Sequence, residues 1–322
     1  MTSVTELLSR LRPDDQAAVS RAISLVENEA PGFEQLLSAI HQRLGRAHRV
    51  GITGPPGAGK STLTEALVRI WRAEGLTAAV VAVDPTSPLT GGALLGDRIR
   101  MVGVTLDPGV FIRSMATRGA LGGLAVTTRE VCDVLDAAGF DRIIIETVGV
   151  GQSELEVVSV ADTVVLVMTP ESGDGIQTLK SGLIEVADLF VVNKADRPGA
   201  ERLLKELEFS LHLGRGSGDV EGAWAPPVLL ATASAGEGVA ALSAEIERHS
   251  AWLRSTGQLA IRRGQRLAAQ TLEIVDRTIR QWGWDTGLAR RTVSERRAEV
   301  EAGRLTPYDV AAEVRRRLEG KQ

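Results

Sequence analysis

The feature that most constrains this chain is a glycine-rich segment, Gly-Pro-Pro-Gly-Ala-Gly-Lys-Ser, at positions 54–61. It fits the pattern G-x-x-x-x-G-K-[ST], which binds nucleotide phosphates where it joins a strand to a helix. Residues 49–53 form a short strand-like run, and residues 60–73 have helical periodicity. Strand, loop and helix therefore stand in the required order, and the sequence predicts a P-loop nucleotide-binding domain.

The residue types in this segment indicate a triphosphate bound with Mg²⁺. The glycines let successive backbone N–H groups converge on phosphate oxygens, and the helix that follows directs the positive end of its dipole at the same anion. Lys60 can reach the β- and γ-phosphates, and the Ser61 hydroxyl can ligate Mg²⁺. We expect the phosphate site to consist of Gly54, Pro55, Pro56, Gly57, Ala58, Gly59, Lys60, Ser61 and Thr62.

Short β-branched runs alternate with longer amphipathic runs through the middle of the chain, which is typical of a parallel sheet built from strand–helix–strand units. The predicted strands are 49–53, 78–83, 110–113, 142–146, 163–168, 189–193 and 228–231. The predicted helices between them are 60–73, 122–138, 176–186, 200–211 and 239–253.

Both ends of the chain have helical periodicity without strands. Residues 1–47 read as an N-terminal helical extension whose last helix covers 34–44, and residues 257–322 read as a C-terminal helical arm. A cap at Thr306–Pro307 starts the last helix of that arm. The fold class is therefore α/β, a three-layer P-loop NTPase sandwich with a mostly parallel central sheet in residues 48–256, plus helical extensions at both ends.

Composition excludes some classes of protein. The 322 residues carry a net charge of −4 and a pI of about 5.7, which argues against a nucleic-acid binder. The sequence has no apolar run of 18 uncharged residues, so we expect no membrane span and no membrane partner. A single cysteine, Cys132, in an apolar stretch predicts a buried thiol in a reducing cytoplasm.

A second motif places an acid where the metal would bind. The buried strand 142–146 ends at Glu146, and the sequence continues as E-x-x-G to Gly149. Ligands of open α/β sheets bind at the carboxyl ends of the strands, so Glu146 is expected to hold Mg²⁺ and the Gly149 N–H to sense the γ-phosphate. In GTPases like Ras a glutamine follows this glycine and orients the attacking water. Val150 stands there instead, which predicts weak intrinsic hydrolysis.

Two further acids precede that motif. Asp84 ends the second predicted strand, and Asp97 follows a glycine-rich stretch where a switch would face the γ-phosphate. Hard cations prefer carboxylate oxygen, so both are predicted Mg²⁺ ligands, directly or through water. A capped turn after a strand is the alternative interpretation of either residue.

The base-reading motif is N-K-x-D at the end of a strand. The Asp196 carboxylate can accept two hydrogen bonds from guanine, whereas adenine lacks the matching pair of donors, so the motif favours GTP over ATP. The Asn193 side chain can contact the purine edge or brace the phosphate loop, and the Lys194 stem can lie over the base. Thr232 and Ala233, after the last strand, are expected to offer a backbone N–H to the guanine oxygen.

Longer segments extend these motifs and resemble one family closely. They resemble the MeaB/ArgK/MMAA GTPases, a group of SIMIBI-class P-loop GTPases associated with methylmalonyl-CoA mutase and once labelled as transport ATPases for lysine, arginine and ornithine. The resemblance covers roughly residues 10–300. The segments that carry it are 83–88, 90–92, 95–101, 146–154 and 193–196.

The resemblance implies a cytoplasmic homodimer with a C-terminal dimerisation arm. It implies a GTP-driven chaperone that gates adenosylcobalamin loading and protects or reactivates a cobalamin-dependent acyl-CoA mutase, with methylmalonyl-CoA mutase as partner. The third switch of the family matches residues 170–182, where Asp174 and Lys180 match residues linked to coupling hydrolysis to the mutase. This chain departs from the better-known members at Gly175, where they carry an acid, and at Thr232, where they usually have serine.

Three other functions remain open from the sequence. A GTPase metallochaperone would share the fold, but that class usually has a Cys- or His-rich segment, and this chain has one cysteine and four scattered histidines. An ATPase associated with a basic amino-acid transport system would need ATP, which N-K-x-D disfavours. A non-enzymatic nucleotide sensor would agree with Val150.

Overall fold

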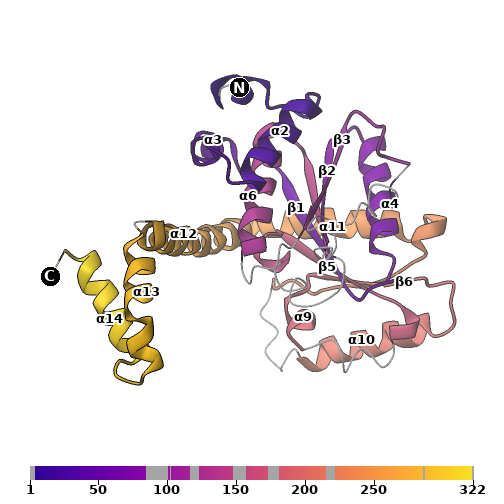
Figure 1. The fold of residues 1–322 in the computed structure, drawn as a ribbon. Helices are drawn as coiled ribbons and strands as arrows, with labels where there is room; N and C mark the ends of the chain where they lie inside the picture. Colours follow the sequence, from indigo (N-terminus) through magenta and orange to yellow (C-terminus); the bar gives the residue numbers. More distant parts are fainter. Residues whose placement is uncertain are drawn as a thin grey trace. The chain divides into compact units, whose positions relative to one another are not determined.

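A computed structural model describes residues 4–84, 101, 103–116, 123–147, 157–172, 181–214, 222–285 and 287–320 of the chain (Figure 1). Contacts divide the chain into two compact units, Met1–Arg263 and Gly264–Gln322. The first unit holds the sheet with its flanking helices, and the second holds helices. The boundary between the two units falls within one long helix in the sequence, residues 258–285.

The first unit is built on a seven-stranded sheet in the order β3-β2-β4-β1-β5-β6-β7, and every neighbouring pair is parallel. All seven predicted strands are confirmed, with ends that differ by three residues at most. The strands are β1 (His48–Thr53), β2 (Ala78–Asp84), β3 (Val110–Ala116), β4 (Arg142–Thr147), β5 (Thr163–Met168), β6 (Leu189–Asn193) and β7 (Val228–Ala231).

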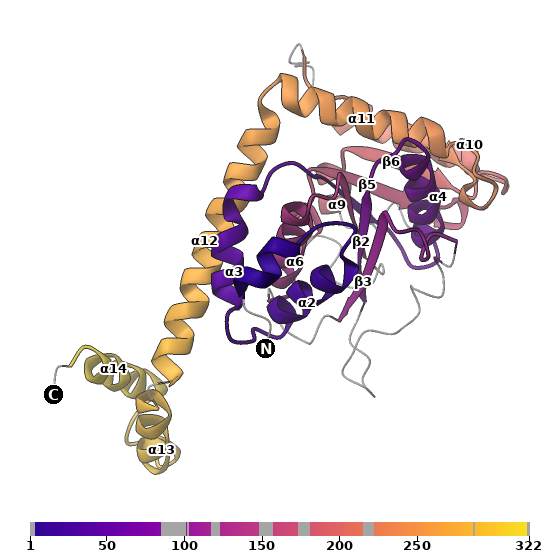
Figure 2. The ribbon, with the colours of Figure 1, turned by 90° about the horizontal axis from the view of Figure 1, so that it is seen from above.

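Helices cover both faces of this sheet because alternate strand residues point to opposite sides. The helices between strands are α4 (Lys60–Ala73), α6 (Gly123–Ala138), α9 (Ser181–Val186), α10 (Ala200–Gly214) and α11 (Val239–Ser255). Ile144 packs with α4 and α11 on one face, whereas Ile143 and Ile145 pack with α6 on the other, and Figure 2 shows these layers from above. This is the three-layer P-loop architecture expected from the sequence.

The N-terminal helices add a further layer over α6. Helices α1 (Val4–Arg10), α2 (Gln16–Glu27) and α3 (Phe33–Ile40) share one apolar core with α6 and β4. The helix predicted over 34–44 was wrong at its end: α3 stops at Ile40 and a short 3-10 turn follows. The chain leaves the helix because the buried Asp136 carboxylate accepts hydrogen bonds from three successive backbone N–H groups, at residues 45–47.

A buried polar network lies at the amino-terminal ends of the strands, at the opposite edge of the sheet from the phosphate loop. The Thr163 hydroxyl lies 2.7 Å from His48 Nε2 and 2.8 Å from His249 Nδ1. His249 Nε2 lies 3.3 Å from Asp188 Oδ1. Arg262 donates to both oxygens of Asp188, at 2.9 and 3.0 Å. The first turn of the long helix α12 (Gln258–Asp285) is therefore joined to the base of the sheet.

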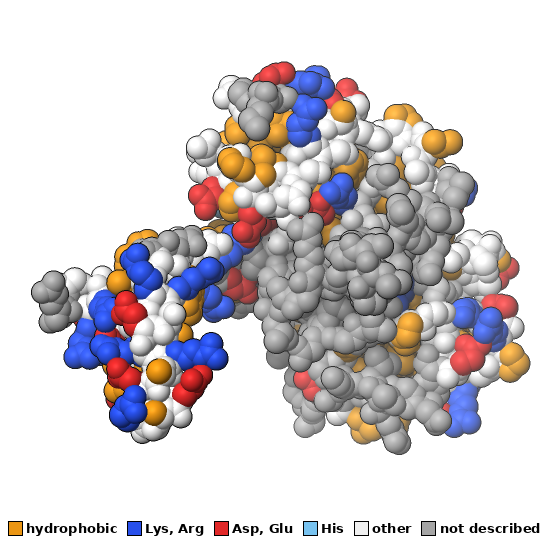
Figure 3. Space-filling model, in the orientation of Figure 1, with side chains coloured by type: hydrophobic (Ala, Val, Ile, Leu, Met, Phe, Trp, Pro, Cys, Tyr) orange, Lys and Arg blue, Asp and Glu red, His pale blue; other side chains and the backbone are white. Residues whose placement is uncertain are grey.

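The second unit contains most of α12, then α13 (Leu288–Glu301) and α14 (Pro307–Leu318). The predicted cap is confirmed, because Thr306 and Asp309 form a reciprocal capping box before Pro307. Figure 3 shows basic and acidic side chains interspersed on the α13–α14 hairpin, and Arg296 and Arg317 both pair with Glu313 there. Among the described residues, no helix combines the length and apolar character that crossing a bilayer needs.

Candidate functional site

The phosphate loop leaves β1 and enters α4 through three glycines in left-handed or related conformations. Gly54, Gly57 and Gly59 have φ of 140°, 75° and 85°, a region that favours glycine. A Cβ at Gly54 would lie 2.0 Å from the Val167 carbonyl oxygen of β5. The loop therefore turns sharply against the neighbouring strand at the carboxyl edge of the sheet.

Lys60 is the first residue of α4 and lies folded over this loop. Its buried ammonium donates to the carbonyl oxygens of Gly54, at 2.8 Å, and Pro55, at 2.9 Å. Ala58 is buried, whereas Pro56 and Gly57 of the loop and Thr62 of α4 are exposed. The loop thus presents one fixed cation and the amino-terminal end of a helix to an anion.

The predicted metal-side acid lies beside the phosphate loop. Glu146 in β4 pairs in register with Ile52 of β1, one residue before the end of that strand. The Ser61 hydroxyl donates to Glu146 Oε1 at 2.5 Å, and the Thr64 hydroxyl donates to Oε2 at 3.0 Å. The structure thus brings together Ser61 and Glu146, which are 85 residues apart in the sequence.

The donor set at this point fits Mg²⁺. A serine hydroxyl and a carboxylate are hard oxygen ligands, and Mg²⁺ is usually held by one or two carboxylates together with substrate phosphates. Within the described part of the chain, no cluster of three or more histidine, cysteine, aspartate or glutamate side chains could hold a metal. The Ser61 hydroxyl and the Glu146 carboxylate are the kind of ligands that hold Mg²⁺ together with a nucleotide.

Other predicted catalytic and metal residues lie outside the described residues. The side chain of Asp84 is among them, although its backbone ends β2 at the same edge of the sheet as Glu146. Asp97, Gly149, Asp174 and Lys180 lie in the segments 85–100, 148–156 and 173–180. Their roles stay predictions from the sequence.

The base-reading loop is tied to the phosphate loop by Asn193. This buried side chain, the last residue of β6, donates from Nδ2 to the Ala58 carbonyl oxygen at 2.8 Å. Its Oδ1 accepts from the Ala233 backbone N–H at 3.1 Å. Of the two roles open from the sequence, the structure places Asn193 as a brace between three loops.

The rest of the N-K-x-D loop is more exposed than Asn193. Lys194 has a left-handed φ of 57°, and Asp196 is exposed next to the end of β6. The Thr232 N–H donates to the Glu237 carbonyl oxygen at 3.0 Å. The backbone N–H groups of Thr232 and Ala233, expected to serve the guanine oxygen, thus both donate within the protein in this structure.

An ion pair connects this loop to the segment after β5. Arg197, directly after Asp196, donates to the Glu171 carboxylate, and this bond is the main reason why the pKa of Glu171 falls to about 2. Both side chains are about half exposed, at 49% and 50%, so the pair contributes little to stability. It extends the range over which Glu171 stays charged to more acidic pH, where the chain enters the predicted third switch.

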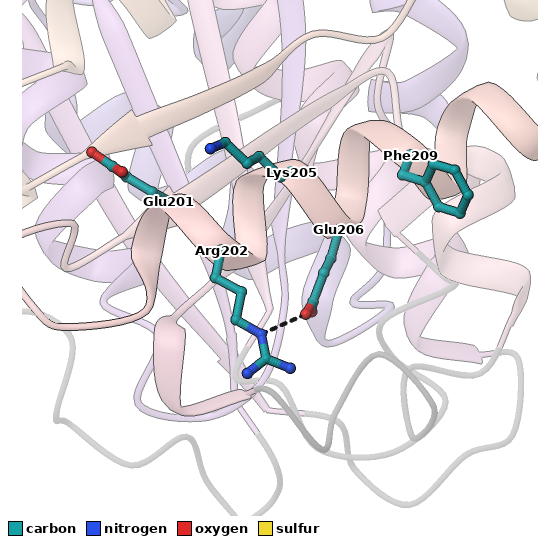
Figure 4. A pocket seen from close by; sticks show the side chains of 5 residues that line it. All are labelled: Glu201, Arg202, Lys205, Glu206 and Phe209. Atoms are coloured by element: carbon teal, nitrogen blue, oxygen red, sulfur yellow. Dashed lines mark hydrogen bonds and ion pairs between the residues drawn. The ribbon is translucent and has the colours of Figure 1, made fainter.

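A hollow on α10 carries no comparable chemistry. Figure 4 shows its side chains projecting from one helix, with Arg202 paired to Glu206 at 2.7 Å. Residues three and four apart on a helix commonly pair in this way on an exposed face. The residues that line the hollow are Glu201, Arg202, Lys205, Glu206 and Phe209.

Sequence reasoning missed Thr64 and the pair formed by Thr53 and Thr147. The Thr147 hydroxyl donates to that of Thr53 at 3.1 Å beside the phosphate loop. A signal for Thr64 was present, because residues three apart lie on one face of a helix and Ser61 already marked the face toward the metal.

The sequence of this chain is similar to those of known proteins. The family model for the methylmalonyl Co-A mutase-associated GTPase MeaB matches residues 19–286. A relative from Pyrococcus horikoshii is 50% identical over 275 residues, 85% of this chain and 86% of the relative. GTPase ArgK of Escherichia coli is 41% identical over 244 residues, 74% of this chain and 73% of that protein.

The fold is shared with a solved structure described as a LAO/AO transport system kinase. The two structures superpose with a TM-score of 0.71 at 30% sequence identity. The match covers 98% of this chain and 97% of the other. The similarity therefore includes the helices at both ends of the chain as well as the sheet.

Proposed function

Because the chain belongs to the MeaB family of methylmalonyl Co-A mutase-associated GTPases, we propose that it is a GTP-hydrolysing chaperone for an adenosylcobalamin-dependent acyl-CoA mutase. The expected partner is methylmalonyl-CoA mutase. In the cytosol the protein gates cofactor loading and protects or reactivates the mutase. The observation that supports this proposal best is the convergence of Ser61, Glu146 and Asn193 on the phosphate loop of a chain with this family match.

The described residues divide the work of nucleotide binding. Lys60 and the amino-terminal end of α4 neutralise the β- and γ-phosphates. Ser61 and Glu146 would hold Mg²⁺, with Asp84 and Asp97 as further predicted ligands. The metal, when bound, offsets the charge of the phosphate oxygens. Asn193 keeps the phosphate loop and the base-reading loop at a constant distance, so that one nucleotide spans both.

Hydrolysis by the isolated protein is proposed to be slow. Val150 follows Gly149 in the position where GTPases like Ras carry the water-orienting glutamine, and an isopropyl group cannot hydrogen-bond to water. Asp174 and Lys180 are proposed to couple hydrolysis to the mutase. A partner that orders this part of the site would then raise turnover.

The experiment is GTP turnover with and without purified cobalamin-dependent acyl-CoA mutases. We expect slow release of phosphate by the protein alone and faster release with methylmalonyl-CoA mutase. Lys180→Ala is expected to lose the stimulation, whereas Lys205→Ala, which changes an exposed lysine on α10, keeps it. Absence of both binding and stimulation with every mutase tried, with or without GTP, would contradict the chaperone proposal.

Nucleotide preference separates this function from an ATPase associated with a basic amino-acid transport system, the alternative that the sequence left open; the similar solved structure is described as a LAO/AO transport system kinase. Asp196→Ala should weaken GTP binding at least about a hundredfold, because two hydrogen bonds to a charged acceptor are lost. Binding of ATP should not change. Asp196→Asn should bind xanthosine triphosphate better than the parent does, because an amide N–H matches the C2 carbonyl of xanthine. Equal affinity of the parent for ATP and GTP would remove the guanine argument.

The protein is further proposed to be a homodimer formed through α12. Leu272, Val275, Ile279 and Trp282 are exposed by 72%, 48%, 62% and 56%. Their spacing of three, four and three residues places them on one stripe of the helix, the pattern that packs helices against each other in coiled coils. A second copy presents the same stripe, so the surface is complementary to itself.

Molar mass in solution tests this proposal. Ile279→Glu should convert the dimer to a monomer, because it places a charge inside the apolar stripe. Gln281→Glu adds the same charge on the opposite side of the helix and should leave the dimer intact. Light scattering after size-exclusion chromatography measures the molar mass of both variants. A parent that is monomeric at high concentration would refute the dimer.

A further inference from the structure

Thr64 makes a contact with the metal-side acid that the P-loop pattern does not require. It lies in α4, three residues after Ser61, and is fully buried. Its hydroxyl donates to Glu146 Oε2 at 3.0 Å, while the Ser61 hydroxyl donates to Oε1 at 2.5 Å. Each carboxylate oxygen of Glu146 thus accepts a hydroxyl from the same face of one helix.

This double contact matters because the acid is a glutamate. Glutamate has one more rotatable bond than aspartate, so its carboxylate can occupy more positions at the end of β4, and ordering it costs more conformational entropy. The Ser61 hydroxyl holds one of the two carboxylate oxygens. The Thr64 hydroxyl holds the other oxygen, so the two contacts together restrict rotation of the carboxylate plane.

The direction of this hydrogen bond is itself informative. A threonine inside a helix commonly returns its hydroxyl to the carbonyl oxygen four residues earlier. Thr64 instead donates out of its helix, to a carboxylate 82 residues further along the chain. Glu146 is 5% exposed, so a carboxylate oxygen without a donor would be costly there.

We propose that Thr64 is a positioning residue for Mg²⁺, which acts by fixing the orientation of the Glu146 carboxylate and touches neither metal nor nucleotide. The inference rests on the proposed binding of GTP with Mg²⁺. Groups that orient metal ligands in this way commonly change metal affinity by about 10- to 100-fold when they are removed.

The experiment measures equilibrium binding of a fluorescent GDP as Mg²⁺ is titrated, and again in EDTA. Thr64→Val removes the hydroxyl but keeps the shape of the side chain. It should raise the half-saturating Mg²⁺ concentration about tenfold and leave the affinity in EDTA unchanged. Thr64→Ser restores the hydroxyl and should return the Mg²⁺ dependence to that of the parent. Thr64→Ala repeats the deletion with less bulk and should behave like Thr64→Val.

Ser243→Ala is the matched control. Trp71, on the same helix, donates from its indole to the Ser243 hydroxyl of α11 at 3.0 Å. The substitution removes one buried hydroxyl contact from α4 without touching Glu146. It should lower the unfolding temperature and leave the half-saturating Mg²⁺ concentration unchanged.

Two results would overturn the inference. One is an unchanged Mg²⁺ dependence in both Thr64→Val and Thr64→Ala, with loss of stability only. The other is a failure of Thr64→Ser to restore the parent's Mg²⁺ dependence. If nucleotide binding by the parent itself does not respond to Mg²⁺, the proposed function fails as well, and this result is distinct from the first two.

Discussion

Single residues decide how closely the backbone segments of the nucleotide site approach one another. Gly54 has a φ of 140°, and its missing side chain would meet the Val167 carbonyl oxygen, which the sheet holds in place. A Cβ at Gly59 would lie 2.4 Å from Asn193 Nδ2, the atom that braces the phosphate loop. The two glycines therefore serve different contacts, one with a strand and one with the base-reading loop.

A matched pair of glycine substitutions tests this view. Gly54→Ala should destabilise the protein by several kcal/mol and abolish GTP binding, because both the backbone angle and the clash at 2.0 Å oppose it. Gly57→Ala also has a positive φ, but a Cβ there meets nothing within 4 Å. It should cost only about 1–2 kcal/mol. Urea unfolding and nucleotide titration measure both, and equal losses would contradict the role of the Val167 contact.

At the scale of elements, α12 depends on a few contacts in its first turns. Asp188 is 7% exposed and receives the Arg262 guanidinium through two hydrogen bonds. Arg263 donates to both oxygens of the fully buried Asp162 carboxylate, at 2.6 and 3.1 Å. The sequence predicted a helical arm here from its periodicity, and these contacts join the first turns of α12 to the sheet.

Removal of one of these arginines should have a measurable cost. Arg262→Ala removes the guanidinium that pairs with the Asp188 carboxylate and should lower the free energy of unfolding by about 2 kcal/mol. This loss is smaller than is usual for a buried ion pair because Arg262 is 35% exposed. Arg280→Ala removes an exposed pair with Asp276 and should change it by less than about 0.5 kcal/mol.

Tryptophan fluorescence during urea unfolding is a suitable readout for these two variants. The Trp224 indole donates to the Asp188 carbonyl oxygen at 2.8 Å and so reports on this region directly. An Arg262→Ala protein as stable as Arg280→Ala would show that the pair with Asp188 is not what anchors α12.

At the scale of the whole molecule, the buried polar network at the amino-terminal ends of the strands makes the free energy of unfolding depend on pH. Burial lowers the pKa of His48 to about 3, from an ordinary value of 6.5, and the nearby Asp162 opposes this shift only in part. The neighbours Arg142, His249 and Arg254 lower it further. The folded protein therefore keeps His48 neutral in a range where the unfolded chain binds a proton.

The difference in proton binding between the folded and unfolded states sets the direction in which stability changes with pH. Below pH 6.5 the unfolded state takes up more protons, so stability is full above that pH and falls as the pH drops toward 3. Between pH 7 and 5.5 this group should remove about 1 kcal/mol of stability. His48→Gln should show a shallower pH dependence than the parent, whereas His41→Gln, at an exposed position, should not. The measurement is the midpoint of urea unfolding as a function of pH between 7 and 5.5. The same pH dependence in the parent and in His48→Gln would contradict the role assigned to His48.

The sequence by itself determined the strands, the loop between β1 and α4 and the end of β6. These features depend on neighbouring residues: β-branched runs favour strands, glycines permit the turn from Gly54 to Gly59, and the cap at Thr306 starts α14. The motif residues in the described part of the chain were predictable for the same reason, because their spacing is local and their chemistry belongs to residue types.

Only the tertiary structure decided which side chains meet. Glu146 accepts from Ser61 and Thr64 because the strand order puts β4 beside β1. Asn193 braces a carbonyl 135 residues away because β6 lies on the other side of β1, beyond β5. No local pattern states that order. The end of α3 at Ile40 likewise depends on a carboxylate about 90 residues later in the chain. Contacts between distant residues follow from how the strands pack, which is a property of the whole sheet.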